Sequence, residues 1–249
     1  MASAQDTSHL DQEKQHAARA AVQWVRDGML VGLGTGSTAA HFITQLGEKV
    51  RAGELRIQGT ATSLASENLA RQVGIPLVEP RRGLRFDLTV DGADELDPQL
   101  NLIKGGGGAL LREKIIATAS DYMLVVADSS KAVAQLGKFP LPLEVVPFAL
   151  PWVLDAVADL GGNPVLRINR QDPSKQAHSD QGNLLVDCHF GQLNDVEKLA
   201  GQLIVIPGIV EHGLFLGIAK AALVVRHDQI EVIRPGMAPQ PASDFTELP

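Results

Sequence analysis

The sequence predicts an α/β fold: a doubly wound, mostly parallel sheet domain with a second, smaller α+β domain of antiparallel strands and two helices. Short apolar runs alternate with helical patterns as far as Lys131, as expected for parallel strands joined by helices. Polar or glycine-rich segments follow these runs, where open α/β sheets bind their ligands. After Lys131, closely spaced prolines change the pattern and indicate a domain crossing.

The composition is that of an ordinary globular protein. The chain has 249 residues, of which 45% are hydrophobic and 20% charged, and this is long enough to bury a substantial core. A formal net charge of -7 argues against nucleic acid or an anionic membrane as the main partner. Cys188 is the only cysteine, and no apolar signal or membrane-spanning stretch is visible, so we expect a cytoplasmic protein.

Helical periodicity and apolar runs place the elements of the first domain. Asp11 is expected to cap the first helix, and Gly28 to end it. The expected helices span residues 11–27, 39–50, 64–73 and 107–120, and the expected strands span 29–33, 55–60, 77–78, 86–90 and 122–127.

The remaining elements form the small domain and a return to the first. Asn194 or Asp195 is expected to cap its second helix, and the tail from Pro235 is expected to be loose. We expect helices at 152–160 and 195–203, strands at 165–169, 183–190 and 203–206, and a returning hairpin at 222–226 and 230–233. These elements predict a catalytic domain of residues 1–134 with 208–249, and a small domain of residues 135–207.

The turn at residues 34–38 has the form of an anion cradle between a strand and a helix. Backbone N–H groups and hydroxyls converge at such a helix N-terminus. Its glycines loosely fit a dinucleotide fingerprint, but the next strand ends without an acidic residue for a ribose hydroxyl. A P-loop is excluded because Ser37 follows Gly36 without an intervening lysine. Phosphate binding and a plain tight turn both remain open.

Four charged residues near two strand ends suggest proton-transfer chemistry. Asp91 and Asp94 share one loop, although a capped turn would also use aspartates. Lys104 precedes four glycines and is suited either to stabilising an oxyanion or to forming an imine. Glu113 follows in the helix as a candidate general base, although a surface glutamate is the alternative. No histidines have metal-ligand spacing, and Cys188 cannot pair with the following histidine on the opposite face of a strand.

Four blocks of sequence, in this order, resemble ribose-5-phosphate isomerase, type A. They lie at residues 31–38, 90–95, 103–114 and 130–142, where the last block is quoted as Ser130-Lys131 and Leu136 to Pro142. The resemblance extends from Lys14 to about Ile233. Residues 60–66 match the family's serine-rich turn only loosely, so no role is assigned there, and the tail beyond Ile233 is longer than expected.

The resemblance implies interconversion of D-ribose 5-phosphate and D-ribulose 5-phosphate in the pentose phosphate pathway, with no metal and no cofactor. Glu113 would move a proton between C2 and C1 through a cis-enediol, and Asp91 would assist ring opening. Asp94 and Lys104 would contact the sugar, with Lys104 stabilising the enediolate. The further implied substrate contacts are Lys14, Thr35, Gly36, Ser37, Thr38, Gly92, Ala93, Gly105, Gly106, Gly107 and Lys131.

The resemblance also implies a homodimer or homotetramer with the small domain at the interface. The alternative function is a non-catalytic sugar-phosphate sensor on the same fold. A sensor would normally carry an attached DNA-binding segment, and the N-terminal extension is too short for one. A lysine-imine enzyme that uses Lys104 is a third possibility.

Overall fold

The computed structural model describes residues 4–227 and 229–242, and a seven-stranded sheet forms its larger part. The strand order is β14-β13-β12-β6-β3-β1-β2. The five strands from β12 to β2 run parallel, whereas β13 and β14 are antiparallel additions at one edge. The bounds are β1 Leu30–Leu33, β2 Gln58–Ala61, β3 Leu88–Asp91, β6 Met123–Asp128, β12 Ala221–Arg226, β13 Gln229–Ile233 and β14 Gln240–Pro241.

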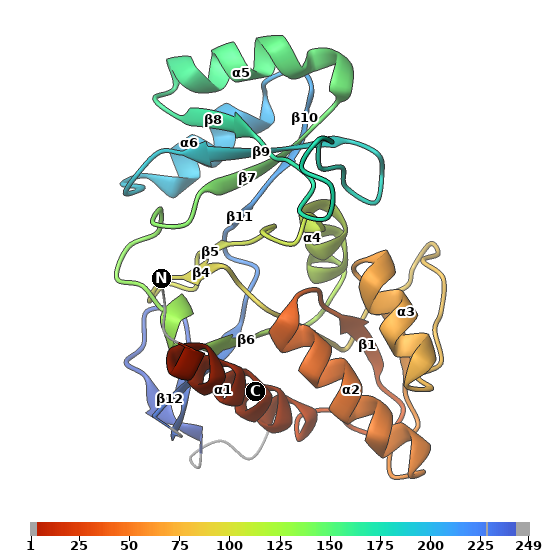
Figure 1. Ribbon diagram of the computed structural model, residues 1–249. Coiled ribbons are helices and arrows are strands. Elements are labelled where there is room, and N and C mark those ends of the chain that lie inside the picture. Colours follow the sequence, from red (N-terminus) through yellow and green to blue (C-terminus); the bar gives the residue numbers. More distant parts are fainter. Residues whose placement is uncertain (1–3, 228, 243–249) are drawn as a thin grey trace.

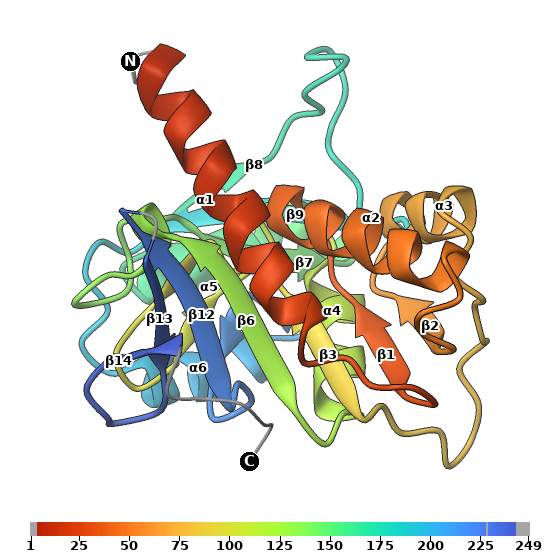
Figure 2. The ribbon, with the colours of Figure 1, turned by 90° about the horizontal axis from the view of Figure 1, so that it is seen from below.

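Helices cover both faces of this sheet, which confirms the predicted doubly wound class. Figure 2 shows α1 (Ala4–Val22), α2 (Ser37–Arg51) and α3 (Leu64–Gln72) along one face and α4 (Leu110–Thr118) behind the sheet. Strand β6 shows how the sequence produces this arrangement. Leu124 and Val126 pack with α1 and α2, and Val125 packs in the cluster on the opposite face. Alternate side chains of a strand point to opposite faces, so an unbroken apolar run fits a strand that is covered on both.

A smaller antiparallel sheet packs at one end of the molecule (Figure 1). Its order is β10-β7-β9-β8, with bounds β7 Leu141–Val145, β8 Asn163–Leu166, β9 Leu184–His189 and β10 Ile209–His212. The helices α5 (Leu150–Asp159) and α6 (Val196–Ile204) supply Val153, Val157 and Leu203 to its core. Four antiparallel strands and two helices confirm the predicted α+β character of this part.

A three-stranded sheet lies between these two larger sheets. It has the order β11-β5-β4, with β4 Glu95–Leu96, β5 Leu102–Ile103 and β11 Leu214–Phe215. Glu95 is buried, and its carboxylate accepts hydrogen bonds from the backbone N–H groups of Gly137 and Phe139. This carboxylate therefore ties the segment that leads into β7 to the small central sheet.

Several sequence expectations were wrong at particular elements. Asp11 does not cap α1, because the helix begins at Ala4 and the Asp11 side chain accepts hydrogen bonds from Gln15 and His41. The strand expected at 203–206 is absent, because α6 continues to Ile204. The tail is not wholly loose, because β14 pairs with β13. Residues 243–249 and Asp228 of the hairpin turn lie outside the described residues.

Other expectations were confirmed with shifted ends. The returning hairpin is formed by β12 and β13, and Asp195 caps α6 by accepting a hydrogen bond from the Lys198 N–H. Strands β7 and β10 were not expected. The domain limits stay a prediction. The pairing of β10 with β7 argues for moving the end of the small domain from residue 207 to beyond His212. In the described part of the chain, no helix combines the length and apolarity needed to cross a bilayer.

Candidate active site

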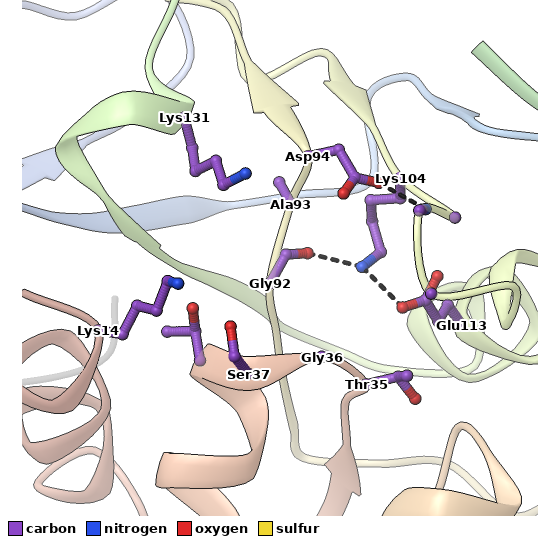
Figure 3. Close-up of a pocket in the computed structure, with 14 residues that line it drawn as sticks. Lys14, Thr35, Gly36, Ser37, Gly92, Ala93, Asp94, Lys104, Glu113 and Lys131 are labelled. Atoms are coloured by element: carbon purple, nitrogen blue, oxygen red, sulfur yellow. Dashed lines mark hydrogen bonds and ion pairs between the residues drawn. The ribbon is translucent and has the colours of Figure 1, made fainter. Parts of the chain in front are cut away.

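The carboxyl ends of β1 and β3, the loop between β5 and α4, and the turn after β6 enclose a cavity of about 120 Å³ (Figure 3). Of the residues named as site candidates from the sequence, all except Asp91 line it. They are Lys14, Thr35, Gly36, Ser37, Thr38, Gly92, Ala93, Asp94, Lys104, Gly105, Gly106, Gly107, Glu113 and Lys131. Asp91 is fully buried beneath this lining.

Lys104 forms the centre of a buried charged group. Its Nζ lies 3.0 Å from Asp91 Oδ2 and 3.1 Å from Glu113 Oε1, and it donates to the carbonyl oxygen of Gly92 at 2.6 Å. Lys104, Asp91 and Glu113 are each less than 5% exposed. The contacts with Gly92 and Glu113 are hydrogen bonds, whereas the contact with Asp91 is an ion pair, so one donor of the ammonium remains for a bound sugar.

The surroundings shift the pKa values of all three groups. Burial is the largest influence on Glu113 and raises its pKa to about 8, with Lys104 opposing the shift and Asp91 adding to it. Burial also raises the pKa of Asp91, against the effect of Lys104. Burial would lower the pKa of Lys104, but the two carboxylates outweigh it and raise that pKa above its usual value. A lysine that keeps its proton cannot attack a carbonyl, which weakens the imine alternative.

The backbone of the glycine loop holds Asp94 in place. The loop consists of residues 105–108, and the N–H of Gly106 donates to Asp94 Oδ2 at 2.7 Å. A Cβ atom on Gly106 would lie 2.5 Å from Asp94 Oδ1. Glycine is therefore required here so that the backbone can approach the carboxylate.

The backbone of the turn after β1 is hydrogen-bonded to Asp91. Asp91 Oδ1 accepts hydrogen bonds from the N–H groups of Thr35, at 3.0 Å, and Gly92, at 2.7 Å. A Cβ atom on Gly34 would overlap the Asp91 carboxylate. Gly36, with φ 105°, precedes α2 without a side-chain cap. The first N–H groups of α2 therefore remain suited to binding an anion.

A cluster of hydroxyls that was not predicted from the sequence supports Thr35. Thr35 Oγ1 lies 2.7 Å from Thr62 Oγ1, 2.8 Å from Ser63 Oγ and 3.2 Å from Ser66 Oγ. Ser66 also donates to the Gly34 carbonyl at 2.6 Å. These residues belong to the 60–66 segment, to which no role was assigned. Their run of hydroxyl residues at the end of β2 was the available signal.

Two lysines lie at the end of the cavity opposite Glu113. Figure 3 shows Lys14 and Lys131 on the side of Ser37, away from Glu113. The Lys14 Nζ lies 4.0 Å from Asp128 Oδ2. This end combines two cations with the N-terminus of α2, and such a combination favours a phosphate group.

Glu13, which was not predicted from the sequence as a site residue, supports this end of the cavity through Ser129. Its side chain is 2% exposed. One carboxylate oxygen accepts hydrogen bonds from the Ser129 N–H at 2.9 Å and from the Ser129 hydroxyl at 2.7 Å. Ser129 begins the short 3-10 helix η1 (Ser129–Lys131), so Glu13 holds the segment that carries Lys131.

The residues present do not form a conventional metal or thiol site. Within residues 4–227 and 229–242, no three histidine, cysteine or acidic side chains gather in a way that could hold a metal ion. Cys188 is buried, and burial raises its thiol pKa to about 12, whereas the neighbouring His189 is exposed. These two side chains therefore do not form a catalytic pair.

The α/β fold carries a small cavity with a cation-lined anion site at one end and a carboxylate–lysine group at the other. These are the parts of a sugar-phosphate isomerase. A profile for "Ribose 5-phosphate isomerase A (phosphoriboisomerase A)" matches residues 58–229. A relative named ribose-5-phosphate isomerase A from Nitrobacter hamburgensis is 51% identical over 228 residues, covering 90% of this chain and 98% of the relative. The chain belongs to the ribose 5-phosphate isomerase A family.

Solved structures agree with this assignment. The ribose 5-phosphate isomerase A of Methanocaldococcus jannaschii is 39% identical, with a TM-score of 0.85 and coverage of 90% of this chain and 98% of that one. A D-ribose-5-phosphate isomerase in complex with phospho-erythronic acid is 36% identical, with a TM-score of 0.87 and coverage of 90% and 99%. The resemblance seen in the sequence is confirmed, and none of these relatives supports the sensor alternative.

Proposed function

We propose that the cavity around Lys104 is where this protein interconverts D-ribose 5-phosphate and D-ribulose 5-phosphate. The observation that carries the proposal is the buried contact between Glu113 and Lys104 at one end of a cavity whose other end carries Lys14 and Lys131. A sugar phosphate has the matching order of groups, with a carbonyl at one end and a dianion at the other.

Glu113 is the proposed base. In the open-chain aldose, its carboxylate removes the proton from C2, and the electron pair of that bond moves into a C1–C2 double bond to give a cis-enediol intermediate. The same carboxyl returns the proton to C1, and a hydroxyl proton passes from O2 to O1, so that the ketose forms without an external reagent. A pKa of about 8 suits this role, since a carboxyl that both accepts and returns a proton works best near the operating pH.

Lys104 and the glycine loop are the proposed stabilisers of negative charge on the sugar oxygens. A buried ammonium is effective there because the surroundings exclude water. Asp94 is the proposed hydroxyl contact. Ring opening stays our proposed role for Asp91, and because this carboxylate is buried and bonded to Lys104, it would act on the sugar through the lysine.

The anion cradle and the two lysines are the proposed phosphate site. Ser37 and Thr38 stand at the N-terminus of α2, where backbone N–H groups favour an anion. Lys14 comes from α1 and Lys131 from η1, so that three separate elements contact one group. Thr35 and Gly36 complete the turn, and Gly92 and Ala93 form the cavity wall between its two ends.

We also propose a cytoplasmic enzyme of the pentose phosphate pathway that assembles as a homodimer or homotetramer through its small domain. Exposed aromatic side chains support this assembly. Phe148 is 82% exposed and Trp152 is 61% exposed, and their rings pack together with centroids 5.6 Å apart. Light scattering on the purified protein tests the assembly, and a monomer at micromolar concentration would contradict it.

The activity is tested with protein that has been dialysed against a chelator, incubated with ribose 5-phosphate and followed for ketose formation. We expect turnover without added metal, and Glu113→Gln should lower turnover by about 10²–10⁴-fold while substrate binding is kept. Borohydride should trap no covalent adduct. Binding of the sugar phosphate without turnover would favour the sensor, and a fully active Glu113→Gln variant would remove Glu113 from the mechanism.

A further inference from the structure

An arginine from the small domain binds the glycine loop and is not among the residues that line the cavity. Arg167 directly follows β8, and its Nη1 donates to the carbonyl oxygens of Gly105, at 3.0 Å, and Gly106, at 3.3 Å. Its Nε donates to Asp187 Oδ2 at 2.8 Å, and its other terminal nitrogen pairs with Asp187 Oδ1. The Arg167 side chain is 13% exposed, and that of Asp187 is 21% exposed. One guanidinium thus serves two loop carbonyls and one carboxylate.

Peptide planarity transmits these contacts to the cavity. In a trans peptide, the C=O and the N–H of the next residue point in opposite directions within one plane. The Gly105 carbonyl bonded to Arg167 therefore fixes the direction of the Gly106 N–H, which donates to Asp94 Oδ2 at 2.7 Å. The Gly106 carbonyl likewise directs the Gly107 N–H away from Arg167, and Gly107 lines the cavity.

The small domain also bounds the loop sterically. A Cβ atom on Gly105 would lie 3.2 Å from Pro142 of β7, and one on Gly108 would lie 2.8 Å from Leu185 of β9. Both glycines have positive φ, 101° and 82°. A chain with so little intrinsic preference needs external contacts to adopt one conformation. Arg167 provides the only side-chain hydrogen bonds to these loop carbonyls recorded for the described residues.

We propose that Arg167, oriented by Asp187, is a positioning residue for the isomerase reaction. It sets the Gly105–Gly106 and Gly106–Gly107 peptide planes so that one N–H holds Asp94 and the next faces the sugar. This inference rests on the proposed function of the cavity. It makes the small domain a part of the active site in addition to its proposed role in assembly. A lysine cannot replace Arg167, because a single ammonium lacks the planar fork that reaches carbonyls and carboxylate together.

The test compares R167K and R167M with the wild type. Arg170 supplies a matched control, since R170M changes an exposed arginine three residues further along the same segment. A second control, V157A, removes buried packing from α5 without touching the loop. Three quantities are measured for each protein: kcat and KM for ribose 5-phosphate, the inhibition constant of inorganic phosphate, and hydrogen–deuterium exchange of the peptides that contain residues 104–108 and 35–38.

We expect R167K and R167M to lower kcat by about 10–100-fold, because a small displacement of aligned groups costs a rate factor of this size. The phosphate inhibition constant should stay within about twofold, since phosphate binds at the other end of the cavity. Exchange should accelerate at 104–108 and not at 35–38. The two controls should keep wild-type kcat and loop exchange.

The proposal is overturned if R167K keeps kcat within about twofold of wild type, or if V157A reproduces its kinetic and exchange changes. If R167M does not fold, R167K alone decides, because it keeps the charge and most of the side chain. A wild-type protein without isomerase activity would refute the proposed function. In that case, hydrogen–deuterium exchange would still test the contact between Arg167 and the glycine loop. Unchanged exchange at residues 104–108 in R167K would refute the positioning role.

Discussion

Replacing Lys104 with methionine tests the buried charged group most directly. The substitution keeps a side chain of similar length and removes the only cation within hydrogen-bond distance of Asp91 and Glu113 among the described residues. Glu113, with a pKa of about 8, is already largely neutral at pH 7. Burial raises the pKa of Asp91, whereas Lys104 and the two backbone N–H groups that donate to its other oxygen lower it, so the charge of Asp91 depends on the lysine.

The size of the effect follows from the proton that Asp91 must then bind. A buried carboxyl without its cation folds in the neutral form, and at pH 7 protonation from the ordinary pKa of 3.8 costs about 4 kcal/mol, at about 1.4 kcal/mol per pH unit. This is the upper limit of the effect, because the raised pKa of Asp91 in the wild type already bears part of it. In the variant the folded-state pKa of Asp91 rises further above its unfolded value. The loss of stability is therefore small near pH 4 and grows as the pH rises. At pH 5 the same arithmetic gives an upper limit of about 1.6 kcal/mol.

Urea denaturation of wild type and Lys104→Met at pH 5 and pH 7 measures this difference. The matched control is Lys49→Met, which removes an exposed partner of Glu54 and should change stability by less than about 0.5 kcal/mol at either pH. Turnover in Lys104→Met should fall by at least about 10²-fold, as for the loss of one donor to a developing oxyanion. A loss of less than about 1 kcal/mol at pH 7, or an equal loss at pH 5 and pH 7, would show that Asp91 does not depend on Lys104 for its charge.

Three further outcomes follow from the site. Turnover should rise with pH to about 8 as Glu113 loses its proton, and a flat pH–rate profile would count against this assignment. The raised pKa of the Glu113 carboxyl should also make wild-type stability fall between about pH 4.5 and 8, with a shallower slope in Glu113→Gln. Denaturation at several pH values measures this slope. Gly106→Ala should lower kcat/KM by about 10²-fold by displacing Asp94. The control Gly201→Ala, in a helix with open space around it, should leave the kinetics unchanged. Equal kinetics in the two variants would contradict the role of the close approach between the Gly106 backbone and Asp94. Glu13→Ala should raise KM by about 3–30-fold with kcat kept, because the turn that carries Lys131 loses its hydrogen bonds to Glu13. Steady-state kinetics test this, and a fall in kcat alone would show that Glu13 acts elsewhere.

Much of the large domain could be predicted because its signals are local. The apolar run at residues 122–127 ends in aspartate and serines, and this pattern alone places β6 and the polar turn that follows it. The turn at 34–38 and the loop at 104–108 were recognisable because glycine is required where a backbone meets a carboxylate closely. The resemblance then assigned roles that spacing had left open.

The features that were missed depend on contacts distant in sequence, or on a misleading residue. Strand β7 was not predicted because it contains Pro142, and proline is unusual in a central strand. This proline is tolerated near the start of β7, where the pairing with β10 extends only as far as Leu143. The contact of Glu13 with Ser129 spans 116 residues. Helical spacing places Glu13 on the same face as the buried Ala17 and Ala21, but α1 alone does not show which group it binds. Arg167 likewise contacts Gly106, from which it is separated by 61 positions in the sequence.

One buried carboxylate connects the two ends of the cavity. Asp91 Oδ1 accepts the N–H of Thr35 in the anion cradle, and Oδ2 contacts Lys104, which in turn contacts Glu113. The spacing between the proposed phosphate site and the proposed base is therefore set by short contacts around one fully buried side chain, with no mobile linker between them. A rigid spacing of this kind selects sugar phosphates by chain length, because the phosphate and the carbon that loses its proton must reach both ends at once.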